Sequence, residues 1–150
     1  MKNFDIEEVK AYIRASTPES AIYVGCDSAK TTKHGVLEAV FATVVVIHHS
    51  SRNGAKVFGR IEYLPDFKTN RERLMKEVEL AIFTSTEILD AVGERSFQLH
   101  LDLNNNPEHY SNCAVKEALG WCRGMGLEPV IKPNSFAASA AADYYAVGAV

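Results

Sequence analysis

The stretch IYVGCDSAK, residues 22–30, carries an aspartate, Asp27, directly after a run of mostly apolar residues. In a second stretch, FQLHLDLNNN, residues 97–106, a mostly apolar run likewise leads to an aspartate, Asp102. Apolar runs of this length bounded by polar residues predict buried strands. Parallel neighbouring strands bring their carboxyl ends to one edge of a sheet, where ligands bind. The two stretches therefore predict a core sheet with two carboxylates side by side at the strand ends.

Length and composition predict one domain that spans residues 1–150, with an N-terminal helix and linker over residues 1–20 packed on it. The chain has 150 residues, of which 47% are hydrophobic, and this supports a substantial core. The net charge is -3. Proteins that hold nucleic acid through bulk charge are basic. Any nucleic-acid binding by this chain must therefore rely on a local patch, metal ions or a partner.

The cysteines and the hydropathy of the chain indicate the cellular compartment in which the protein is expected. The three cysteines are widely spaced and form no C-x-x-C pair. This pattern indicates buried thiols in a reducing compartment rather than a disulfide framework or a zinc site. The N-terminus has no signal-peptide pattern, and no segment has the ~18 apolar residues that would span a membrane. We expect a soluble cytoplasmic protein, and the sequence leaves open whether it has a protein partner or forms a homo-oligomer.

Apolar periodicity and turn residues predict the order β-β-β-α-β-α-β-α after a short N-terminal helix capped by Asn3. This order gives a five-stranded mixed sheet of the α/β type with helices on both faces. The expected elements are a strand at 21–27 followed by a polar loop, strands at 36–49 and 57–64, a helix at 70–92 with Gly93 as its C-cap, a strand at 97–103, a helix at 110–126, a strand at 127–133 and a helix at 134–150.

Two carboxylates at adjacent strand ends repel each other unless a cation lies between them or one is protonated. Hard oxygen ligands on rigid strands suit Mg²⁺ or Mn²⁺. Asp27 and Asp102 are therefore candidate metal ligands. The alternative for each is a structural role as an Asx turn, with Asp27 capping toward Ala29 and Asp102 capping the LNNNPE turn.

Two helices supply further candidate acids. Asp143 is a lone charge on the alanine-rich segment AASAAADYYA, where an acid is costly unless it is solvated, paired or metal-bound. On the helix at 70–92, Glu77 shares a face with small and apolar residues that suit close packing on the sheet. Glu79 shares a face with Phe83 instead. We therefore choose Glu77 over Glu79, and the alternative for both is a solvated helix acid.

The element order and these acids together resemble the ribonuclease H fold. Asp27, Glu77, Asp102 and Asp143 match its acids on the first strand, the first helix after the three-stranded meander, the fourth strand and the last helix. The chain most resembles the YkuK-like group of bacterial and phage proteins. This resemblance covers most of the chain from residue 21 onward, through the stretches YVGCDSAK, LMKEVELA, HLDLNNNPEHYSN and GWCRGMGLEPVIKPNSFAASAAAD.

The resemblance implies hydrolysis of phosphodiester bonds by two metal ions, Mg²⁺ or Mn²⁺. Asp27 would bridge both ions, Glu77 and Asp102 would hold one, and Asp143 the other. Two such ions stabilise the attacking and leaving oxygens. The remaining candidate roles are substrate contacts and proton transfer. Lys30 and Lys132 could contact phosphates, and Ser28 and Asn104 could contact a 2′-hydroxyl or a phosphate. His109 could shuttle protons to the leaving group.

Each of these assignments has a structural alternative. Lys30 and Lys132 could be solvated surface lysines, and His109 an exposed loop histidine. An Asx turn is an equal alternative for Asn104. His100, inside the fourth predicted strand, is expected to be a buried histidine with satisfied hydrogen bonds.

Three function classes follow. The first is a metal-dependent nuclease acting on RNA, an RNA–DNA hybrid, or single-stranded or branched DNA. The second is a catalytically silent module that binds nucleic acid or protein on the same fold. The third, a nucleotide phosphatase or ATPase, is disfavoured because no G-x-x-x-x-G-K-[ST] loop is present and SAKTTK follows the first strand. A serine hydrolase is not supported, because the chain has no G-x-S-x-G motif.

Overall fold

The computed structural model of the chain describes residues 3–33, 36–49, 54–65, 69–104, 106, 108 and 114–149. Its elements follow the predicted order, and a five-stranded mixed sheet lies at the centre. The elements are α1 (Ile6–Ala15), β1 (Ala21–Lys33), β2 (Val36–His48), β3 (Ala55–Pro65), α2 (Asn70–Val92), β4 (Ser96–His100), α3 (Val115–Gly124), β5 (Pro129–Val130), the π-helix η2 (Ala137–Ala142) and α4 (Asp143–Gly148).

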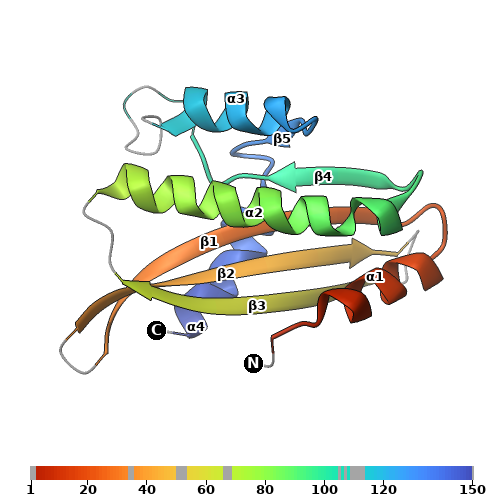
Figure 1. Cartoon of the computed structure of the whole chain (residues 1–150), viewed down its shortest axis with the longest axis horizontal. Coiled ribbons are helices and arrows are strands. Elements are labelled where there is room, and N and C mark those ends of the chain that lie inside the picture. Colours follow the sequence, from red (N-terminus) through yellow and green to blue (C-terminus); the bar gives the residue numbers. More distant parts are fainter. Residues whose placement is uncertain are drawn as a thin grey trace.

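The strand order in the sheet is β3-β2-β1-β4-β5. β1, β2 and β3 form an antiparallel meander, whereas β4 pairs parallel to β1 and β5 parallel to β4. Helices cover both faces: Figure 1 shows α1 and α2 in front of the sheet and α4 behind it. The predicted mixed sheet with helices on both faces is therefore confirmed.

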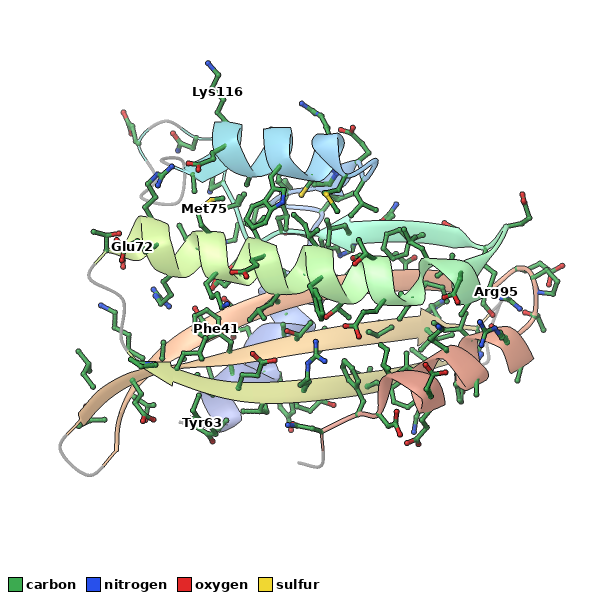
Figure 2. The ribbon with its side chains drawn as sticks, in the orientation of Figure 1. Phe41, Tyr63, Glu72, Met75, Arg95 and Lys116 are labelled. Atoms are coloured by element: carbon green, nitrogen blue, oxygen red, sulfur yellow. The ribbon has the colours of Figure 1, made fainter. Side chains whose placement is uncertain are left out.

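Two apolar cores hold these layers together. The larger lies between the sheet and α1, α2 and α3, and it contains Phe41 of β2, which is labelled in Figure 2. The smaller lies on the other face, where Val44 and Val46 of β2 meet Ala137 and Ala142 of η2. Neighbouring β2 residues therefore serve different cores, because successive side chains of a strand point to opposite faces.

The helix α2 was predicted at its observed bounds. Thr69 caps its start, where the Thr69 hydroxyl accepts a hydrogen bond of 3.1 Å from the Glu72 backbone N–H. It ends at Gly93, whose φ of 58° is a backbone conformation that favours glycine. At the other end of the chain, Asp5 rather than Asn3 caps α1, and the Asn3 side chain bonds the backbone of Ile61 in β3.

β1 is longer than predicted and β4 is shorter. Residues 28–33, expected as a loop, extend β1 because they pair with β2 as far as the Lys33–Val36 pair. Beyond Ser28 the hairpin leaves the core, because residues 29–32 are partly or fully exposed, so polar residues are compatible with strand structure there. β4 stops pairing with β1 at the Gly25–His100 pair, where the predicted strand ran on to residue 103. Residues 101–103 instead bond toward the other side, since the Leu101 N–H donates to Val130.

The last helix also differs from the prediction. It begins at Ala137 rather than at 134, and its first part is a π-helix. α4 continues from it at Asp143. The described residues contain no helix that is both long and apolar enough to cross a bilayer.

Candidate functional site: a carboxylate cluster at the end of β4

Asp27 lies in the middle of β1, not at its end as predicted. It pairs with Ala42 of β2 and is 7% exposed. Because β4 ends at His100, opposite Gly25, the β1 edge at Asp27 has no parallel neighbour. A mid-strand residue caps no turn, so the Asx alternative for Asp27 is wrong. The strand places this carboxyl at a gap in the sheet.

The backbone of η2 comes very close to β1 beside this gap. A Cβ atom on Gly25 would lie 2.5 Å from both the Ala137 carbonyl carbon and the Ala138 nitrogen. Gly25 therefore permits the contact. The start of η2 is also tied to β4, because the Ala137 N–H donates a 3.0 Å hydrogen bond to His100 Nδ1. This close packing carries Asp143, six residues on, to the Asp27 carboxyl, with which it shares a hydrogen bond.

His100 is a buried histidine with both ring nitrogens bonded, as predicted. Its Nδ1 accepts from Ala137, and its Nε2 lies 2.9 Å from Gln98 Oε1. Burial lowers the pKa of His100 to about 4, so the ring is neutral at pH 7. It positions η2 and carries no charge into the site.

Glu77 reaches the gap from α2, on the opposite face of the sheet. It is 6% exposed, and its Oε1 accepts a 2.6 Å hydrogen bond from the Ser28 hydroxyl. Arg73, one turn earlier on α2, donates to the same Ser28 hydroxyl over 2.9 Å. Glu79 faces solvent and bonds Lys76 at 3.1 Å. Of the two acids considered on this helix, Glu77 is therefore the one that faces the sheet.

Asp102 approaches from the segment that follows β4. Its Oδ1 accepts hydrogen bonds from the Ser139 hydroxyl of η2 at 3.1 Å and from the Lys132 ammonium at 3.0 Å. These partners come from other elements of the fold. In the segment that follows, Asn104 forms an Asx turn, since its side chain accepts from the Asn106 N–H at 2.8 Å.

Electrostatics show that the acids form one cluster. The pKa of Asp27 is raised to about 10, first by burial, then by the Glu77 charge, the hydrogen bond with Asp143 and the Asp102 charge. Burial also raises the pKa of Glu77 to about 8, with a further contribution from Asp102, against opposing effects of Ser28, Arg73 and the Asp27 hydrogen bond. The buried pair Asp27 and Glu77 thus holds protons at neutral pH, because both charges cannot be accommodated together.

The remaining predicted residues fall in different places. Lys132 contacts the cluster through Asp102, and Ser28 is buried between Glu77 and Arg73. Lys30 is exposed on β1, three residues beyond Asp27. Asn104 forms the Asx turn that was its alternative role. His109 lies outside the described residues.

Sequence reasoning missed two residues of the cluster. Arg73 could have been found, because it lies four residues before Glu77 and so shares its helical face. Ser139 had no comparable signal. It lies four residues before Asp143, but its contact with Asp102 depends on how η2 crosses the sheet.

The donor chemistry of the cluster fits a divalent cation. Four carboxyl groups on four separate segments supply only hard oxygen donors, and once Asp27 and Glu77 lose their protons the four negative charges exceed the two nearby cations, Arg73 and Lys132. As they are arranged, no group of three or more His, Cys, Asp or Glu side chains within the described ranges could hold a metal ion. One oxygen of Glu77 accepts a hydrogen bond from Ser28, and one oxygen of Asp102 accepts from both Ser139 and Lys132.

Comparison with known proteins identifies the family. A family model described as Ribonuclease H-like matches residues 5–147. The chain belongs to this family. The resemblance of the sequence to the ribonuclease H fold and to the YkuK-like group is thereby confirmed. Searches of curated proteins and of solved structures give no match.

Proposed function

We propose that this Ribonuclease H-like protein hydrolyses phosphodiester bonds in nucleic acid with the help of divalent metal ions. One observation carries the proposal: Asp27, Glu77, Asp102 and Asp143 come from four different segments and meet where β1 loses its parallel neighbour. A fold core does not need four acids at one place, and their mutual repulsion is unfavourable without cations. Acidic residues that are costly to the fold are expected at a functional site.

The four carboxylates would hold Mg²⁺ or Mn²⁺, and the bound ions would supply charge stabilisation for the attacking and leaving oxygens of the phosphate. The protein must then lose the protons of Asp27 and Glu77. Lys132 would exchange its contact with Asp102 for a contact with the phosphate backbone, which fits the substrate role predicted for it. The negative net charge of the protein does not oppose binding of a phosphate at the cluster, because bound metal ions would neutralise the acids there.

A second candidate function is a binding module on the same fold with no catalysis. It is favoured by the bonds that Asp102 and Glu77 make within the protein, and by the absence of a ready metal-holding group in the part of the chain that is described. In this case Lys132 and Ser139 are permanent partners of Asp102, and the acids serve as a hydrogen-bonded network.

Cleavage of labelled substrates distinguishes the two functions. Purified protein is incubated with RNA, RNA–DNA hybrid, single-stranded DNA and branched DNA in Mg²⁺, Mn²⁺ or EDTA. We expect cleavage that requires metal and that falls at least ~100-fold in Asp102→Asn, the range over which single electrostatic groups act in catalysis. Glu79→Gln, which removes an exposed acid from the same helix as Glu77, is the control and keeps full activity.

The absence of cleavage on every substrate, with folded protein, would contradict the nuclease proposal and favour the binding module. Cleavage that survives in Asp102→Asn would show that the activity does not arise at this cluster.

A further inference from the structure

A groove of about 960 Å³ lies between α4 and the edge strand β3. Its walls carry three tyrosines, Tyr63 of β3 and Tyr144 and Tyr145 of α4. Tyr144 is 75% exposed and Tyr63 is 42% exposed. Figure 2 shows Tyr63 at this edge of the sheet, close to the C-terminal helix. Large exposed aromatic side chains gathered in one groove mark a binding surface.

The groove is continuous with the carboxylate cluster. Asp143 lines the groove and also shares a hydrogen bond with Asp27. A strand whose phosphate is held at the cluster would therefore have the groove next to it on one side. The tyrosine hydroxyl of Tyr63 donates to the Ala149 carbonyl at 3.1 Å, which fixes its ring against the end of α4.

The chemistry of the walls favours bases over phosphates. None of the described residues that line the groove is a lysine or an arginine. A double helix binds mainly through its two phosphate backbones and needs cations along them. An unpaired strand can add the stacking of its bases on aromatic rings, which tolerates any sequence, whereas the bases of a double helix are already stacked and paired. Tyr144 and Tyr145 form an edge-to-face pair, with ring centroids 5.4 Å apart at an interplanar angle of 81°, and Tyr144 is the exposed member of the pair.

We infer that this groove is a base-stacking subsite that selects single-stranded nucleic acid, with unpaired bases on Tyr144 and Tyr63 next to the scissile phosphate. The inference rests on the proposed function for its substrate class, and it is tested by binding rather than by cleavage. Both RNA and DNA strands have the required bases, so the experiment includes one of each.

Fluorescence anisotropy with labelled oligonucleotides in EDTA measures this binding without any metal-dependent cleavage. We expect single-stranded RNA or DNA to bind more tightly than the corresponding duplex and hybrid. Tyr144→Ala should weaken single-strand binding by roughly tenfold, the effect of losing one stacked base, and Tyr144→Phe should retain it. Wild-type protein should bind a single strand with abasic sites as weakly as the Tyr144→Ala variant binds an intact single strand. Phe83→Ala, which removes an aromatic residue that is 57% exposed on α2, is the control.

The outcomes separate this inference from the proposed nuclease. Metal-dependent cleavage with equal single-strand binding by wild type and Tyr144→Ala would overturn the subsite and leave the nuclease. Base-dependent binding lost in Tyr144→Ala, without cleavage, would support the subsite and contradict the nuclease. Absence of any oligonucleotide binding would overturn the subsite. A dimer in sedimentation that Val147→Asp abolishes would also overturn it, because the groove would then hold a second copy of the chain.

Discussion

Asp27 is the residue on which the site depends most, because it is buried and contacts the other acids. Its pKa is raised to about 10 by burial and by Glu77, Asp143 and Asp102. The folded protein therefore holds a proton that the unfolded chain releases above about pH 4. The free energy of unfolding must fall as pH rises through this window, since the folded state binds more protons than the unfolded state.

We predict that, without divalent metal, wild-type protein melts at a lower temperature at pH 8.5 than at pH 5.5. Asp27→Asn removes the ionisable group, so its melting temperature should exceed that of wild type by an amount that grows with pH and is larger by roughly 5 °C at pH 8.5 than at pH 5.5. Differential scanning calorimetry across this range measures the effect, with Glu79→Gln as a control. The same pH dependence in wild type and Asp27→Asn would contradict the raised pKa.

At the level of single residues, sequence periodicity could separate Glu77 from Glu79, because a helical face that packs on a sheet consists of small and apolar neighbours. It could not predict the hydrogen bonds that hold Glu77 and Asp102. Those bonds join residues such as Ser28 and Glu77, 49 positions apart, and they depend on how elements cross.

At the scale of helices and strands, some features of the fold are determined by the local sequence and others are not. α2 has an N-cap residue, Thr69, and a C-cap residue, Gly93, so its bounds could be predicted from the local sequence. The extension of β1 to Lys33 is set by pairing with β2, and polar residues 28–33 gave no local sign of it. The π-helical start of η2 could not be predicted either, because an alanine-rich segment indicates an α-helix and the π-helix is rare. π-helical turns are frequent at functional sites.

The contact between η2 and β1 is the element-level feature that places Asp143. We predict that Gly25→Ala lowers the free energy of unfolding by about 1–3 kcal/mol, because the new methyl group would overlap the backbone at Ala137 and Ala138. Asp143 should move with η2, so any metal-dependent cleavage should fall as well. Thermal denaturation and the cleavage assay measure the two effects.

Gly120→Ala is the matched control for this prediction. It adds the same methyl group to an exposed glycine of α3 with no atom within 4 Å, and should stabilise the protein by up to about 1 kcal/mol. Equal effects of the two substitutions would show that the approach of η2 to β1 is not a tight constraint.

In the whole molecule, the sheet brings acids from both of its faces to one point. Asp27, Asp102 and Asp143 lie on the η2 and α4 side, and Glu77 comes from the α2 side past the open edge of β1. The strand order that allows this was predictable, because a meander followed by alternating helices and strands has few arrangements. The gap left by the early end of β4 was not, since residues 97–103 read as one continuous strand.

Metal-induced thermal stabilisation measures whether these acids form the single metal site that we propose. We predict that Mn²⁺ or Mg²⁺ raises the melting temperature of wild type, more at pH 8.5 than at pH 6, because the ion must replace protons on Asp27 and Glu77. Asp27→Asn and Asp102→Asn should each remove most of the rise, and Glu79→Gln should keep it. Equal rises in wild type and in both aspartate variants would contradict a shared metal site.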